Sequence, residues 1–241
     1  GVSNQRYTYN TRGQLTASWT DTDSDGVMDS NENRKVYTWT YTGLLKQANV
    51  YTNSGGTLTT VNYTYDESGT GMLRERSVVS GTAIRFHWEG LNIYLEEEKS
   101  GSTWYPKRAF VNQPSGLGGT MARFDLGANY QLDTSDSGYF YYYDEAGNVI
   151  LIVDKTGAVT DQFEQDCWGN DLNNTFSSAR AIKQHQTNKY LDETTGLYFF
   201  GARWYDPTIS RFISVSPLAP MSEEEYVYCG DNPVNKIDNN G

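Results

Sequence analysis

The chain has 241 residues, a mass of 27.2 kDa and a formal net charge of −11. This acidic balance argues against nucleic acid and anionic lipid as partners, because both need a basic surface. Only 37% of the residues are hydrophobic, yet 14% are aromatic, and no segment approaches the roughly 20 apolar residues of a membrane span. The composition therefore excludes helical membrane insertion and intrinsic disorder.

A repeated aromatic motif recurs along residues 7–169. In five of six copies, two aromatic residues flank one other residue, and in the sixth Gln165 takes the second position. A polar residue, two variable residues and usually a glycine follow, as in Tyr141-Tyr-Tyr143-Asp144-x-x-Gly147. Residues two apart on a strand share a face, so each pair predicts an aromatic stripe on one side of a sheet. Asp-x-x-Gly is typical of a type I turn. Each copy therefore predicts one β-hairpin.

Six copies share this register. Their aromatic residues are Tyr7, Tyr9, Tyr37, Trp39, Tyr63, Tyr65, Phe86, Trp88, Tyr141, Tyr143 and Phe163. The turn positions 10, 40, 66, 89, 144 and 166 are 30, 26, 23, 55 and 22 residues apart, so we expect insertions in the intervals of 30 and 55 residues. Because one hairpin is marginally stable in water, the copies should stack into one continuous antiparallel sheet. An ordinary β-sandwich with tyrosine-rich strands is the alternative, but it does not explain the recurring turn.

The interval of 30 residues contains an acidic loop that has the spacing of an EF-hand calcium loop. Its flanks alternate like strands, so it is more similar to the calcium loops of extracellular bacterial and thrombospondin-type repeats. Five carboxylates in twelve residues repel one another unless a cation is bound, which predicts a Ca²⁺ site and, with it, an extracellular location. A solvated acidic hairpin tip is the alternative. The expected ligands are Asp21, Asp23, Asp25, the carbonyl of Val27, Asp29 and Glu32.

Helix signals are few. Residues 177–184 and 220–226 are expected to form short helices, the second with Ser222 as its N-cap. The two cysteines, Cys167 and Cys229, allow one disulfide in an oxidising compartment, but we favour two unpaired thiols that act as small apolar residues.

The C-terminal residues carry a more specific pattern. It comprises Tyr190-Leu-Asp192, then Gly196-Leu-Tyr198-Phe-Phe200-Gly-Ala-Arg203-Trp204-Tyr205-Asp206-Pro207, Ser210-Arg211-Phe212-Ile213-Ser214 and Asp231-Asn232-Pro233-Val234-Asn235-Lys236-Ile237-Asp238. Together with the upstream aromatic repeats, it resembles the Rhs repeat-associated core of YD-repeat proteins, which include bacterial Rhs proteins, Tc toxin C subunits and animal teneurins. The resemblance implies an all-β fold in which antiparallel hairpin repeats spiral into a hollow shell closed by a core-like C-terminal domain.

The implied organisation is a YD-repeat β-sheet region at 1–176, with the calcium loop inserted at 21–32, and an Rhs core-like domain at 177–241. We expect a structural segment of a longer shell in a secreted or cell-surface protein. Its partner would be the remainder of the shell or an encapsulated polypeptide. Two alternatives stay open: a self-cleaving shell that releases a C-terminal toxin, and a cell-surface adhesion or carbohydrate-binding module, since exposed aromatic rings stack on sugars.

Members of this family cut their own chain with two aspartates, helped by an arginine of an Arg-Phe-x-Ser-x-Asp-Pro stretch. Arg211 matches the arginine and Asp238 the second aspartate, but Ser216 stands where the first aspartate is expected. A hydroxyl cannot share a proton with Asp238 at neutral pH as a second carboxylate would. We therefore expect no self-cleavage and no enzymatic activity, with Arg211 and Asp238 in a buried ion pair or as turn caps.

Overall fold

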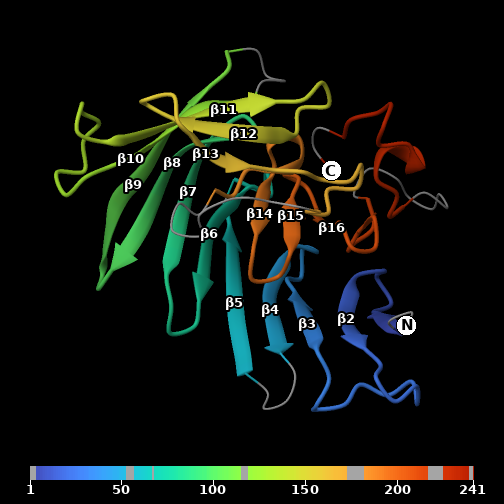
Figure 1. Ribbon diagram of the computed structural model, residues 1–241. Coiled ribbons are helices and arrows are strands. Elements are labelled where there is room, and N and C mark those ends of the chain that lie inside the picture. Colours follow the sequence, from blue (N-terminus) through green and yellow to red (C-terminus); the bar gives the residue numbers. More distant parts are fainter. Residues whose placement is uncertain are drawn as a thin grey trace.

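The computed structural model describes residues 4–52, 57–66, 68–114, 119–172, 182–216, 225–238 and 241. Thirteen antiparallel strands form one long sheet in sequence order, with β1 and β13 at its two edges. Four short strands form a second sheet that lies against the middle of the first (Figure 1). The predictions of an all-β chain and of one continuous sheet of stacked hairpins are confirmed. No helix among the described residues is long and apolar enough to span a membrane.

The long sheet comprises β1 (Gln5–Tyr9), β2 (Leu15–Thr20), β3 (Arg34–Trp39), β4 (Leu45–Thr52), β5 (Thr57–Tyr65), β6 (Leu73–Val78), β7 (Ala83–Glu89), β8 (Asn92–Ser100), β9 (Thr103–Asn112), β10 (Thr120–Asp125), β11 (Ser137–Tyr143), β12 (Val149–Asp154) and β13 (Val159–Gln162). The short sheet comprises β14 (Tyr190–Asp192), β15 (Leu197–Phe199), β16 (Trp204–Asp206) and β17 (Arg211–Phe212). Two short 3₁₀ segments are η2 (Gln186–Asn188) and η3 (Cys229–Asp231).

The hairpin turns owe their shape to a polar side chain and a glycine. Asp144 Oδ1 accepts hydrogen bonds from the amides of Ala146 at 2.9 Å and Asn148 at 2.8 Å. Gly147 donates to the carbonyl of Asp144 at 3.1 Å with a φ of +84°, a conformation that glycine adopts without strain. Asp166 and Gly169 repeat the arrangement. The chemistry of Asp-x-x-Gly therefore explains these turns.

The aromatic stripe forms the contact between the two sheets. Tyr63 lies 4.8 Å from Trp204 and Phe86 lies 4.8 Å from Tyr190, measured between ring centroids. One hydrophobic core includes residues of both sheets, among them Leu15 and Leu45, which are fully buried. The expected repeat and core-like regions therefore share this core.

The interval of 55 residues differs from the prediction. It contains one further hairpin, β9–β10, and the loop before β11, so most of the supposed insertion belongs to the regular sheet. Phe110 occupies the first aromatic position of this hairpin, whereas Asn112 stands where the second aromatic residue would be. The loss of that aromatic residue hid the hairpin in the sequence.

Two other predictions concern local structure. The predicted helices at 177–184 and 220–226 lie mostly outside the described residues, and Gln184 forms an antiparallel bridge with Tyr190. Cys167 is exposed and Cys229 is buried, and the two are unpaired.

Candidate functional site

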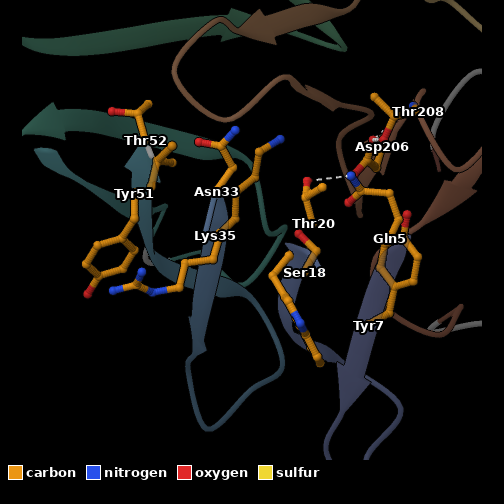
Figure 2. A pocket seen from close by; sticks show the side chains of 13 residues that line it. Gln5, Tyr7, Ser18, Thr20, Asn33, Lys35, Tyr51, Thr52, Asp206 and Thr208 are labelled. Atoms are coloured by element: carbon orange, nitrogen blue, oxygen red, sulfur yellow. Dashed lines mark hydrogen bonds between the residues drawn. The ribbon is translucent and has the colours of Figure 1, made fainter. Parts of the chain in front are cut away.

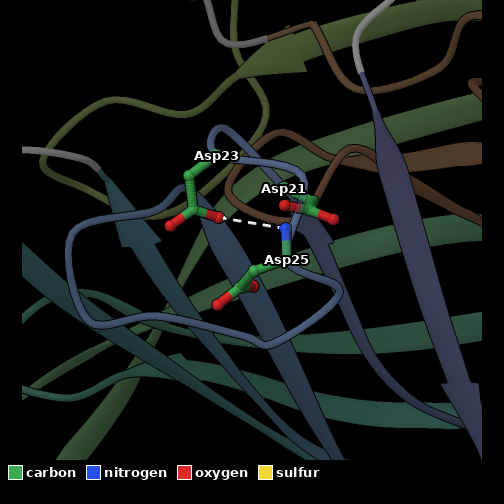
Figure 3. A group of neighbouring side chains, drawn as sticks. All are labelled: Asp21, Asp23 and Asp25. Atoms are coloured by element: carbon green, nitrogen blue, oxygen red, sulfur yellow. Dashed lines mark hydrogen bonds between the residues drawn. The ribbon is translucent and has the colours of Figure 1, made fainter.

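The acidic loop between β2 and β3 brings three carboxylates together. Oxygens of Asp21, Asp23 and Asp25 lie within 4.8 Å of one another, and the chain curls around them (Figure 3). Asp23 Oδ1 accepts from the amide of Asp25 at 3.3 Å, and Asp25 Oδ1 accepts from the amide of Val27 at 2.7 Å. These local bonds arise because aspartate favours turns over strands. They hold the three carboxylates on one side of the loop.

Asp21 is the anchor of this cluster. Its side chain is 0% exposed, and its Oδ2 accepts from Arg6 Nε at 2.9 Å and from the amide of Gly26 at 3.0 Å. Burial alone would raise the pKa of Asp21, but these hydrogen bonds outweigh it and hold the pKa below its ordinary value. Oδ1 is buried and has no hydrogen-bond partner among the described residues. A buried anionic oxygen without a partner is stabilised by a hydrogen-bond donor or by a bound cation.

The other three expected ligands are placed differently. Glu32 is buried, and its two oxygens accept from the amide of Thr22 at 2.6 Å and from the amide of Asp29 at 3.0 Å. These hydrogen bonds lower the pKa of Glu32. Val27, whose carbonyl is the expected ligand, is 57% exposed as a whole residue. Glu32 thus closes the loop, whereas the group of carboxylates close enough to share an ion consists of Asp21, Asp23 and Asp25.

The charge of the loop also affects Asp29. Its desolvation, followed by repulsion from Asp25 and Asp23, raises the pKa of its carboxyl group. Desolvation and the neighbouring like charges both favour the neutral carboxyl group. A bound divalent cation would reverse this preference. The loop can therefore hold a hard cation through oxygen ligands.

An open groove of about 490 Å³ lies beside the inner face of β1–β4 (Figure 2). Asp206 is the carboxylate of its lining, and Asp206 Oδ1 already accepts from the amide of Thr208 at 2.9 Å and from its hydroxyl at 2.6 Å. Lys35 Nζ donates to the carbonyl of Thr195 at 2.7 Å. Asp206 and Lys35 of this groove therefore already make structural hydrogen bonds within the protein.

Each of the residues expected to correspond to the self-cleavage site has a described partner outside that set. Arg211 forms an ion pair with Asp231, with 3.3 Å between Nη2 and Oδ2, at the surface rather than in the core. The amide of Ser216 donates to the carbonyl of Glu225 at 3.0 Å. Asp238 Oδ1 accepts from the amide of Gly241 at 2.9 Å. Arg211 thus pairs with an aspartate other than Asp238.

A further set of polar contacts was not anticipated from the sequence. In five hairpins, the residue at the second motif position donates a side-chain hydrogen bond to a main-chain carbonyl of the preceding hairpin. The five bonds are Trp39 to Leu15 at 2.8 Å, Tyr65 to Leu45 at 2.8 Å, Trp88 to Leu73 at 2.6 Å, Asn112 to Ile93 at 2.9 Å and Tyr143 to Thr120 at 2.5 Å. We call them the inter-hairpin ladder.

The ladder explains a bias in the motif. The first aromatic position accepts phenylalanine, as at Phe86 and Phe163, whereas the second holds tyrosine or tryptophan in the first five copies. Both of these side chains carry a donor at the end of a large apolar ring, which suits a half-buried position that must reach a carbonyl. This bias was visible in the sequence, but the acceptor was not.

Comparisons with known proteins fit this architecture. The chain is 27% identical over 226 residues to the tRNA nuclease WapA of Bacillus subtilis, a match that covers 88% of this chain and 9% of that protein. It is 27% identical over 165 residues to the double-stranded DNA deaminase toxin A of Burkholderia cenocepacia, covering 64% of this chain and 11% of that protein. The chain thus spans about a tenth of the length of these relatives. No protein-family model matches it.

Among solved structures, the crystal structure of TcdB2–TccC3 without its hypervariable C-terminal region superimposes with a TM-score of 0.66 at 18% identity. The match covers 98% of this chain and 13% of that one. The crystal structure of TcdB2–TccC3–TEV gives a TM-score of 0.65 at 17% identity. The chain shares the fold of the matched part of this Tc toxin structure. The all-β fold that the YD-repeat resemblance implied is therefore present.

Proposed function

We propose that this chain is a structural segment of a YD-repeat shell in a secreted or cell-surface Rhs-like protein. The shell encloses or presents a partner domain, and this segment performs no catalysis. One observation supports the proposal above all: the long sheet turns its aromatic stripe inward onto β14–β16, and the two layers share one core. A sheet that is curved around the terminal strands of its own chain can form the wall of an enclosure.

The relatives carry nuclease and deaminase activities in their names, but they are about ten times longer than this segment. The net charge of −11 disfavours contact between this segment and nucleic acid. We therefore assign any such activity to other parts of a longer protein. The proposed role of this segment is to form part of the wall of the shell and to close it.

Limited proteolysis of the longer natural polypeptide tests the shell role. A segment enclosed by the shell should be digested at least about tenfold more slowly than the same segment expressed alone. Trp204→Ala should abolish the protection, because Trp204 packs on Tyr63 and donates to the hydroxyl of Tyr65, and both of these residues lie on the other sheet. Equal digestion of the enclosed and the isolated segment would contradict the proposal. The same gel reports self-cleavage: we expect one intact band, and two bands would favour the toxin-releasing alternative.

The carbohydrate-binding alternative depends on exposed aromatic rings. Tyr63 and Tyr141 are 3% and 7% exposed, and the hydroxyls of Tyr65 and Tyr143 donate within the inter-hairpin ladder. These four rings are therefore committed to the fold, which favours the shell role over sugar binding by the motif.

We also propose that the loop at 21–32 binds Ca²⁺ through Asp21, Asp23 and Asp25, with Val27 and Asp29 as further oxygen donors and Glu32 closing the loop. The observation that supports this is the buried Oδ1 of Asp21, which has no partner among the described residues and belongs to a cluster of three carboxylates. Oxygen-only donors suit a hard cation, and extracellular calcium modules bind with dissociation constants of about 10⁻⁴ to 10⁻³ M. Calcium would fasten the turn between β2 and β3.

Isothermal titration calorimetry with CaCl₂ tests this site. The natural chain should bind one Ca²⁺, and Asp25→Asn should weaken binding at least about tenfold. Asp154→Asn is the matched control, because Asp154 is also a turn aspartate but lies in the hairpin of β12 and β13. An absence of calcium heat, with no change in melting temperature on chelation, would show that the loop is a solvated acidic tip.

A further inference from the structure

The inter-hairpin ladder has a sixth donor with no partner among the described residues. Tyr9 occupies the second motif position on β1, as Trp39 does on β3 and Tyr65 on β5. In those hairpins the donor reaches back to the neighbouring strand of the preceding hairpin. β1 is the edge of the sheet, and no strand in the described part of the chain supplies an acceptor on its outer side. The side chain of Tyr9 is 46% exposed, and its ring packs edge-on against Tyr226 at 5.7 Å.

Some main-chain N–H and C=O groups of β1 also face this outer edge, away from β2. The carbonyl of Asn4 accepts from Asp21, and the amide of Asn10 donates to Gln14, so both residues face β2. Because main-chain groups alternate in direction along an antiparallel strand, those of Gln5, Tyr7 and Tyr9 face away from β2. The sequence of β1, Gln-Arg-Tyr-Thr-Tyr, contains no proline, and its one charged side chain, Arg6, is paired with Asp21 of the loop after β2. This edge is therefore competent to pair.

We propose that the free edge of β1 is the docking site for another β-hairpin of the same repeat type, and that Tyr9 Oη fixes its register by donating to a main-chain carbonyl of that hairpin. The occupant follows from the five bonds of the ladder, each of which joins the first strand of one hairpin to the second strand of its predecessor. This inference rests on the proposed role of the chain as a segment of a longer sheet. It identifies the hydrogen bond that would set the register between β1 and the docked hairpin.

The chain itself supplies a suitable hairpin for the test. If residues 34–56 are repeated directly before Gly1, Tyr9 follows the copied Gly56 by the same nine positions that separate Gly56 from Tyr65. The copied Leu45 carbonyl then stands in register with Tyr9, as Leu45 does with Tyr65. We expect the amide of Tyr7 to exchange with deuterium at least about tenfold more slowly in this extended chain than in the natural chain.

Substitutions at position 9 test the role of the hydroxyl. Tyr9→Phe should make the Tyr7 amide exchange about fivefold faster in the extended chain and leave the natural chain unchanged. Tyr9→Trp should retain the protection, because tryptophan performs the same role at Trp39. Exchange of amides in β6–β8, measured in the same samples, reports whether each variant is folded.

Two results would overturn the proposal: unchanged exchange of Tyr7 in a folded extended chain, or protection that survives Tyr9→Phe in full. A natural chain that dimerises in sedimentation experiments with Tyr7 already protected would identify a second copy as the occupant, and this also overturns it. None of these results depends on an enclosed partner domain. Failure of the docking proposal for β1 is therefore distinguishable from failure of the proteolysis test of the shell.

Discussion

Arg76 Nε and Nη2 each donate a hydrogen bond of 3.0 Å to the carboxylate of Asp192. Arg76 belongs to β6 of the long sheet, and Asp192 ends β14 of the short one. Asp192 is fully buried and also accepts from the hydroxyl of Tyr63 at 2.6 Å. The stripe of aromatic contacts between the two layers thus contains a buried ion pair with directional bonds, which fixes how β14 sits on the sheet.

The ion pair predicts a large loss of stability when its charge is removed. Asp192→Asn leaves a guanidinium buried without its counter-charge, and we expect unfolding to become easier by about 3–5 kcal/mol in urea denaturation. Glu75→Gln is the matched control, because Glu75 pairs with Arg85 at 2.8 Å but both side chains are partly exposed. That change should cost less than about 1 kcal/mol. Equal losses in the two variants would contradict the assignment.

The inter-hairpin ladder predicts the effect of removing one hydroxyl. Tyr65 Oη donates to the carbonyl of Leu45 and accepts from Trp204 Nε1 at 2.9 Å. Tyr65→Phe leaves both partners unsatisfied, so we expect a loss of about 1–3 kcal/mol in chemical denaturation. Tyr41→Phe, at a side chain that is 92% exposed, should have no measurable effect. A neutral Tyr65→Phe would mean that the ladder contributes little to stability.

Two turn glycines should respond differently to alanine. Gly147 has a φ of +84° and open space where the methyl group of an alanine would lie, so Gly147→Ala should cost only the left-handed strain of about 1–2 kcal/mol. At Gly169, with a φ of +89°, a Cβ would lie 2.0 Å from Oε1 of the buried Gln186. Gly169→Ala should therefore cost about 1–3 kcal/mol more. Thermal melts of both variants would show the difference, and equal melting temperatures would contradict the crowding at Gly169.

The pH dependence of stability should show the effect of Lys189. Burial lowers the pKa of Lys189 to about 8, although the nearby Asp238 opposes the shift. Between pH 8 and about 10.4 the unfolded chain binds a proton that the folded chain does not, so stability falls as the pH falls through this window. Lys189→Met removes the titrating group. The variant should gain at least about 1 kcal/mol at pH 7 and little at pH 10. A gain that is the same at both pH values would contradict the assignment.

Arg6 should oppose calcium binding, because its guanidinium already occupies one oxygen of Asp21. Removing that charge with Arg6→Gln should raise the affinity for Ca²⁺ by up to about tenfold, as expected for the loss of one like charge beside the ion. Arg12→Gln is the control, since Arg12 donates to the carbonyl of Tyr41 rather than to the loop. Weaker binding by Arg6→Gln would instead mean that Arg6 positions Asp21 for the ion.

The sequence by itself determined the hairpins. The alternation of aromatic residues in each motif and the Asp-x-x-Gly turn chemistry are local properties, set by neighbouring residues on one strand and one turn. They predicted the single long sheet and its aromatic inner face. The hairpin at Phe110 was missed because Asn112 makes the ladder bond through an amide, and an aromatic pattern cannot detect that substitution.

Only the tertiary structure decided which distant groups meet. The pairing of Arg76 with Asp192 joins residues 116 positions apart, and that of Tyr63 with Asp192 joins residues 129 apart. The sequence likewise offered six regularly spaced calcium ligands, whereas the folded loop gathers Asp21, Asp23 and Asp25 and uses Glu32 to satisfy its own amides. Spacing along a chain fixes which residues can meet within a turn or a strand. Contacts between layers, and the choice between an ion and an amide as partner, depend on the packing of the whole chain.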